Sequence, residues 1–134
     1  MKLYLSGPMT GLAHFNAPQF NAVAHQLRSE GYDVINPVEE DLKRGIDTRG
    51  MKGDPAEMAP FGHSAGSLIG EDVKHIIDGD FDGIVLLSGW ARSKGSRIEL
   101  TPFIVLGKRV FVWSNGLREL QRQQAITALA EALR

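Results

Sequence analysis

The chain has 134 residues, of which 43% are hydrophobic and 23% are charged, which is enough apolar material for the core of one domain. The formal net charge of -1 argues against a nucleic-acid partner, because such proteins carry an excess of positive charge. The chain has no cysteine, which excludes disulfides, thiolate metal sites and a cysteine nucleophile. The apolar run at residues 1–6 is too short for a signal peptide and no run is long enough to span a membrane, so we expect a cytoplasmic protein without membrane contact.

Strand-like and helix-like segments alternate along the chain. Residues 3–5 predict a short buried strand, and residues 16–30 predict a helix in which Asn16 is the cap and Gln19 completes a capping-box spacing. The remaining predicted elements are a strand at 32–35, a helix before residue 78, a strand at 83–88, a helix that ends at Gly107, a strand at 109–113 and a final helix over about 117–133. This alternation predicts a single α/β domain over residues 1–134, with a small parallel sheet and flanking helices in Rossmann-like or flavodoxin-like order.

One long segment, residues 39–67, interrupts this rhythm. It is rich in glycine and mixed charges and has no sustained apolar period. Such a segment in a compact domain is either a functional lid or a mobile surface insertion without a role. Its position after the second strand puts it at the carboxyl edge of the sheet, which favours a lid.

Glu99 is the most informative residue of the chain. It follows a buried strand and a loop of small residues, so it is expected on the first turn of a helix at the edge where open α/β sheets bind ligands. Two interpretations stay open. The sequence Ser96-Arg97-Ile98-Glu99 has the form of a capping box, in which Glu99 only closes the helix. Alternatively, Glu99 takes part directly in a chemical reaction.

Asp72 is the second candidate carboxylate. It lies beside the apolar stripe of the preceding helix, and partial burial there raises the pKa of an acid and suits it to proton transfer. Alternatively, Asp72 is only an acid favoured by the helix dipole. The residues of the stripe, all expected to face the sheet, are Ile69, Val73, Ile76 and Ile77.

Other motifs do not support a site. Residues 78–83 match half of a calcium loop but lack the closing glutamate, so we interpret them as a helix-to-strand turn. Residues 6–11 contain glycine but are no dinucleotide fingerprint. The four histidines lack metal-ligand spacing, although His63 is able to reach a ligand from the insertion. We expect neither a metal nor an organic cofactor.

Several segments together resemble the nucleoside 2-deoxyribosyltransferase superfamily, over about residues 1–38 and 66–115. The shared order and spacing are closest to a deoxyribosyltransferase-like branch common in phages and bacteria. The matching segments are Tyr4-Leu5-Ser6-Gly7-Pro8-Met9-Thr10-Gly11, Asn36-Pro37, Asp72, Leu87-Ser88-Gly89-Trp90, Gly95-Ser96-Arg97-Ile98-Glu99-Leu100 and Leu106-Gly107-Lys108-Arg109-Val110.

The resemblance implies roles for three residues. Glu99 matches the nucleophile that attacks the anomeric carbon of a nucleoside and forms a covalent deoxyribosyl-enzyme, by the logic of a retaining glycosidase. Asp72 matches an acid near the sugar that positions or activates this nucleophile. Tyr4 matches a tyrosine whose hydroxyl orients the glutamate, although a tyrosine that only packs at the start of a strand is the alternative.

The resemblance also implies a substrate, which is a nucleoside or its 5′-monophosphate. Hydrolases of the superfamily have a serine six residues before the nucleophile, where transferases have an aspartate, and here that residue is Ser93. With Arg92, Lys94 and Arg97 nearby it suits a phosphate, unless these cations are merely a solvated loop. Pro8 and Thr10 depart from the hydrolase pattern. The implied substrate contacts are Ser6, Gly7, Thr10, Gly11, Ser93, Gly95, Ser96 and Asn115.

The family further implies a homo-oligomer, a dimer or higher, in which Ser114 or Asn115 of a neighbouring subunit completes the pocket. The resemblance therefore implies cleavage of an N-glycosidic bond, with transfer of the deoxyribosyl group to water or to a second base. A non-catalytic nucleotide-binding or sensing module on the same fold is the alternative.

Overall fold

The computed structural model describes residues 1–62 and 65–134, and its centre is a five-stranded sheet with the order β2-β1-β3-β4-β5. The first three pairings are parallel, and β5 runs antiparallel to β4. The strands are β1 (Lys2–Ser6), β2 (Asp33–Ile35), β3 (Gly83–Leu86), β4 (Arg109–Trp113) and β5 (Leu117–Leu120). The expected α/β class and flavodoxin-like order of the parallel strands are confirmed, and the strand order reverses between β1 and β3.

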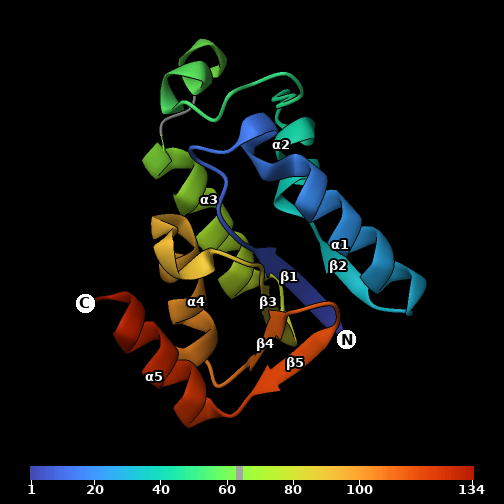
Figure 1. Ribbon diagram of the computed structural model, residues 1–134, viewed down its shortest axis with the longest axis vertical. Coiled ribbons are helices and arrows are strands. Elements are labelled where there is room, and N and C mark those ends of the chain that lie inside the picture. Colours follow the sequence, from blue (N-terminus) through green and yellow to red (C-terminus); the bar gives the residue numbers. More distant parts are fainter. Residues whose placement is uncertain (63–64) are drawn as a thin grey trace.

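Helices cover both faces of the sheet. Figure 1 shows α1 on one side and α3, α4 and α5 on the other. The helices are α1 (Ala17–Ser29), α2 (Pro37–Lys43), α3 (Ala65–Asp78), α4 (Lys94–Val105) and α5 (Arg122–Ala132), with short 3-10 helices η1 (Ala13–Asn16), η2 (Pro55–Phe61) and η3 (Trp90–Arg92). Because strand side chains alternate between faces, Leu3 and Leu5 pack toward α1, whereas Tyr4 packs toward α3 and α4.

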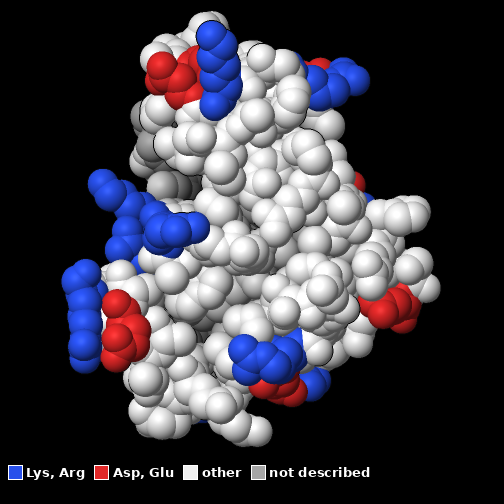
Figure 2. Space-filling model, in the orientation of Figure 1, with Lys and Arg blue, Asp and Glu red and all other residues white. Residues whose placement is uncertain are grey.

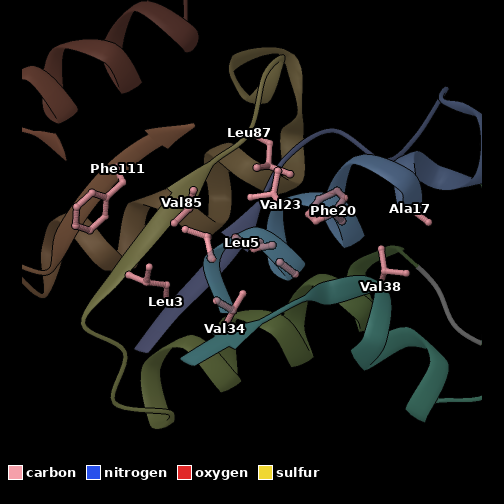
Figure 3. Packing of buried hydrophobic residues seen from close by; sticks show 12 residues of the cluster. Leu3, Leu5, Ala17, Phe20, Val23, Val34, Val38, Val85, Leu87 and Phe111 are labelled. Atoms are coloured by element: carbon pink, nitrogen blue, oxygen red, sulfur yellow. The ribbon is translucent and has the colours of Figure 1, made fainter. Parts of the chain in front are cut away.

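The core on the α1 side is continuous across four strands (Figure 3). Phe20 and Leu27 of α1 are fully buried against Leu5 of β1 and Val85 of β3. Burial of a side chain of this size contributes about 1.5–3 kcal/mol, so this layer stabilises the four parallel strands of the sheet.

The C-terminal region differs from the sequence expectation. The predicted single helix over 117–133 is wrong, because residues 117–120 form the edge strand β5 and α5 starts only at Arg122. Asn115 and Gly116 adopt positive φ angles of 56° and 153°, which lets the chain reverse between β4 and β5. The reversal pairs Trp113 with Leu117.

Two local expectations about the helices are also corrected. Asn16 precedes α1, but in a left-handed conformation (φ 64°) that prevents its side chain from capping the helix, and its amide donates to Pro8 O and Gln19 Oε1 instead. Ile77 of α3 is 55% exposed and does not face the sheet, whereas Ile76 is buried. Adjacent residues of a helix are 100° apart, and here Ile77 falls outside the buried face to which Ile76 belongs. Residues 78–83 form the expected turn between α3 and β3.

The insertion at 39–67 begins in helix α2 and ends in helix α3. Its start belongs to α2, which Asn36 caps by accepting a hydrogen bond from the Val38 amide at 3.0 Å. Ile46, just after α2, is fully buried. His63, expected to reach a ligand from this segment, lies outside the described residues. Figure 1 shows the insertion at the end of the sheet toward which the β1 arrow points.

Candidate functional site

Glu99 lies on the second turn of α4 and not on its first. The helix begins at Lys94, and Ser93 caps it by accepting a hydrogen bond from the Ser96 amide at 3.2 Å. The capping-box interpretation of Glu99 is therefore wrong, because Ser93 is extended (φ -93°, ψ 118°) and supplies the cap three residues earlier than expected. Glu99 is free to point at the sheet.

Two hydroxyls of β1 hold the Glu99 carboxylate. Tyr4 donates from its hydroxyl to Glu99 Oε2 at 2.8 Å, and Ser6 donates from Oγ to Oε1 at 2.7 Å. Tyr4 and Ser6 are two residues apart on one strand, so the pleat aims both at the same helix. One donor on each oxygen fixes the plane of the carboxylate. The predicted contact between Tyr4 and Glu99 is thus present.

Ser96 extends this network below the carboxylate. Its Oγ lies 3.0 Å from Ser6 Oγ, and both serines are only 1% exposed. A hydroxyl has a single hydrogen, so when Ser6 donates to Glu99 the proton between the two serines comes from Ser96. Ser6 and Ser96, expected as substrate contacts, are placed where they support the carboxylate.

Burial and a neighbouring charge make Glu99 a weaker acid than an exposed glutamate. The residue is 7% exposed, and removal from water, together with the negative charge of Asp72, raises its pKa from 4.5 to about 7. The hydrogen bonds from Ser6 and Tyr4 act in the opposite direction. Burial and the charges of Glu99 and Asp72 also raise the pKa of Tyr4 well above 10, so its hydroxyl keeps its proton and remains a donor.

Asp72 is brought to the same site by α3, and it is paired with a cation from the insertion. Its carboxylate accepts from Arg44 Nη2 at 3.0 Å, and both side chains are less than one fifth exposed. Burial raises the pKa of Asp72, while Arg44 lowers it. The two acids therefore interact across the site, with Tyr4 within electrostatic reach of both.

Arg44 is the site residue that the sequence analysis missed. It follows α2 and contacts three acids: Asp41 at 2.8 Å, Glu71 at 2.9 Å and Asp72 at 3.0 Å. A cation at the end of a helix is normal in any sequence, so no local signal marked it. Only its ion pairs with Glu71 and Asp72 of α3 make it part of the site.

The first loop, after β1, packs against the end of β3. The Leu87 amide donates to Ser6 O at 2.8 Å, and a Cβ on Gly7 would lie 2.8 Å from the Leu87 side chain. The absence of a side chain at Gly7, an expected substrate contact, therefore permits the close approach of Leu87. Gly11, also expected to contact the substrate, donates its amide to Gly53 O at 2.8 Å. Thr10 is exposed.

The loop before α4 presents positive charge. Arg92 and Lys94 are exposed, whereas Arg97 bonds Ala132 O at 3.1 Å. Figure 2 shows basic side chains over the region where η3 and α4 begin, with no described acidic side chain beside them in this view. First-turn amides of a helix, here including that of Gly95, have no acceptor within the helix. Anions are stabilised at such a terminus.

Asn115 lies apart from Glu99 within the chain. It is exposed in the turn after β4, and β4 is separated from β1 by β3. Ser114, its neighbour, donates its amide to Gly116 O at 3.0 Å. Both residues are at the carboxyl end of β4, the same edge of the sheet as the site, but nothing in one subunit brings them to the carboxylate.

Over residues 1–62 and 65–134, no group of three or more histidine or acidic side chains is arranged to hold a metal ion. In the same part of the chain, no helix combines the length and apolar composition needed to cross a membrane.

A comparison with family models matches residues 1–112 to a domain of unknown function (DUF4406). No curated protein matches the chain, and no solved structure does.

Proposed function

The chain belongs to the DUF4406 family. From the resemblance of its motifs and the hydrogen bonds that hold Glu99, we propose that it cleaves the N-glycosidic bond of a 2′-deoxynucleoside or its 5′-monophosphate. In this proposal Glu99 is the nucleophile and forms a covalent deoxyribosyl ester. Water or a second base then takes the deoxyribosyl group from the enzyme. The sequence resemblance to nucleoside 2-deoxyribosyltransferases gives the reaction class, and the site geometry supports it.

The observation that carries the proposal is a buried carboxylate held in one orientation by two hydroxyl donors. Glu99 accepts from Tyr4 at 2.8 Å and from Ser6 at 2.7 Å, at the carboxyl edge where the strand order reverses. A nucleophile fixed in this way needs little reorganisation when a sugar carbon approaches. Its raised pKa leaves a substantial anionic fraction at neutral pH and a more basic oxygen than an exposed glutamate has.

The proposed reaction has two steps. In the first, an oxygen of the Glu99 carboxylate forms a bond to C1′ as the C1′–N bond breaks, and the bonding electrons leave with the base. The base takes up a proton from solvent as it leaves, while the ionised Asp72 positions Glu99 and the sugar. In the second, water or a second base attacks C1′ and gives up a proton to solvent, and the ester bond to Glu99 breaks, returning the carboxylate. Net retention of configuration follows from two displacements.

Recognition of the substrate is assigned to the two loops at this edge. Gly95 and Ser93 at the start of α4, with the exposed Arg92 and Lys94, would hold a phosphate or the base. Thr10 would contribute a hydroxyl from the first loop. Because the Gly11 amide is engaged by Gly53, the α4 loop takes the larger share of phosphate recognition in this proposal.

The test is release of free base from a panel of deoxynucleosides and their 5′-monophosphates, with and without a second base, followed by chromatography. Glu99→Ala should abolish release, and Asp72→Asn should lower it strongly. Glu119→Gln serves as the control, because Glu119 is an exposed residue of β5 that pairs with Arg109. Release from monophosphates alone would identify a hydrolase that requires the phosphate, and release that needs an acceptor base would identify a transferase. Release unaffected by Glu99→Ala would contradict the proposal.

A second candidate, a nucleotide-binding module without turnover, is favoured by the burial of the carboxylate. Glu99 is 7% exposed, and a hollow of about 210 Å³ lies away from it, between Ile76 and Lys108 at the opposite edge of the sheet. A ligand that raises the melting temperature of both the native protein and Glu99→Gln, without release of base, would support this candidate over the enzyme.

The proposal includes a homo-oligomer in the cytoplasm. Exposed apolar side chains on the outer helices support an assembly, among them Ile98 (46%) and Val105 (72%) of α4. A neighbouring subunit would bring Ser114 or Asn115 to the carboxyl edge. Light scattering after size-exclusion chromatography measures the mass of the assembly. If Asn115 completes the site of a neighbouring subunit, Asn115→Ala should lower base release without changing the mass of the oligomer.

A further inference from the structure

Arg44 is a residue of the insertion that contacts Asp72, one of the two acids of the site. It follows α2, yet its guanidinium reaches α3 and contacts Glu71 through Nε at 2.9 Å and Asp72 through Nη2 at 3.0 Å. Nη1 binds Asp41 at 2.8 Å. Each of the three nitrogens thus contacts a different carboxylate, and the side chain is 18% exposed.

The surroundings of Asp72 contain few other positive charges. The titratable groups that act on it or on its partner acid come from every neighbouring element. They are Tyr4 on β1, Asp41 on α2, Glu71 and His75 on α3, and Glu99 on α4. Four of these are acids or become anionic on losing a proton, so two ionised carboxylates repel each other unless a cation offsets them.

We propose that Arg44 is a positioning residue that fixes the Asp72 carboxylate in its ionised form within the site. The inference rests on the proposed function for its catalytic consequence, but its physical content is independent of turnover. The guanidinium holds one face of Asp72 by a short charged hydrogen bond, which is stronger than a neutral one. By offsetting the charge of Asp72 it lowers the cost of a second anion on Glu99.

The insertion acquires a role from this contact. Its first residues are not a free lid, because α2 is bound to α3 through Arg44. Further along, Gly53 accepts from the Gly11 amide at 2.8 Å and Met51 accepts from the His14 amide at 2.6 Å. The insertion therefore connects Asp72 to the first loop. A displacement of α2 would move Arg44 and so change the ionisation of Asp72 and Glu99.

The experiment compares the protein with Arg44→Gln and Arg44→Lys. The titration of Asp72 and Glu99 is followed by carbon NMR of labelled carboxyl groups, without substrate. Loss of a cation at this distance is expected to raise the midpoint of the Asp72 titration by about one pH unit or more. Lysine keeps the charge but not the three-way contact, so its midpoint should lie between the two. Arg28→Gln, which removes an arginine paired with Glu39 outside the site, is the matched control and should leave both midpoints unchanged.

The outcomes separate this inference from the proposed function. In a base-release assay, the acid limb of the pH profile should move to higher pH in Arg44→Gln and largely return in Arg44→Lys. An Asp72 midpoint that is the same in all variants overturns the inference, whether or not base is released. A shifted midpoint in a protein that releases no base leaves the inference standing and removes the enzyme. If Arg44→Gln does not fold, an unchanged Asp72 midpoint in Arg44→Lys overturns it.

Discussion

Substitution of Glu99 by glutamine should make the protein less sensitive to alkaline pH. The native state raises the pKa of Glu99 from 4.5 to about 7, so between these values the folded protein binds a proton that the unfolded chain has released. Stability therefore falls as pH rises through this range. At about 1.4 kcal/mol per pH unit, the interval corresponds to about 3 kcal/mol. Glutamine has nearly the same shape but no charge, and it escapes this loss.

The quantity to measure is the difference in unfolding free energy between Glu99→Gln and the native protein, from urea titrations at several pH values. It should increase by about 3 kcal/mol from pH 4.5 to pH 8.5. Glu30→Gln, at an exposed glutamate after α1, is the control and should give a constant difference. A difference that stays constant for Glu99→Gln as well would refute the reasoning, because Glu99 would then ionise as readily in the folded protein as in the unfolded chain.

Three further substitutions test the contacts around the site. Tyr4→Phe keeps the ring but removes a hydrogen bond to Glu99, the proposed nucleophile, worth about 1.5–3 kcal/mol. For the proposed activity, kcat/KM for base release should fall at least tenfold, and the pKa of the Glu99 carboxyl, followed by carbon NMR, should rise. Unchanged values would show that this bond does not act on it. Gly7→Ala places a methyl group 2.8 Å from the Leu87 side chain and should destabilise the fold by about 1–3 kcal/mol in urea titrations. Gly53→Ala brings a methyl group 2.4 Å from Leu12 O at a φ of 91°, so hydrogen exchange at residues 50–53 should accelerate, and unchanged exchange would contradict the contact.

The parallel part of the fold was predictable because its signals are local. Short apolar runs followed by glycine or proline gave β1 and β2, and Gly107 separates α4 from β4 with a left-handed φ of 70°. The antiparallel strand β5 was missed because its apolar residues also fit a helical spacing into α5. The Asn115-Gly116 pair is a common hairpin sequence and was the overlooked signal.

The candidate site was predictable only in part. The sequence and its resemblance picked out Glu99 and Tyr4, and the structure places them in direct contact. Ser93 and Ser96 are both able to cap a helix, and spacing alone does not say which residue begins it. Arg44 could not be predicted, because its role depends on a contact with Asp72, which lies 28 residues further along the chain.

The attachment of the insertion to the first loop has a consequence for how the length of this chain can vary. Residues 44–53 are held at both ends. Arg44 binds Asp72 of α3 at one end, and Met51 and Gly53 make backbone hydrogen bonds to the first loop at the other. Adding or removing a residue there would shift one attachment relative to the other. The side chain of Glu57 accepts from the Lys52 and Asp54 amides, which ties residues 54–57 to the second attachment. None of the residues of η2 is buried. Insertions and deletions among relatives should therefore concentrate after Glu57, where an engineer would also place a tag or a second domain.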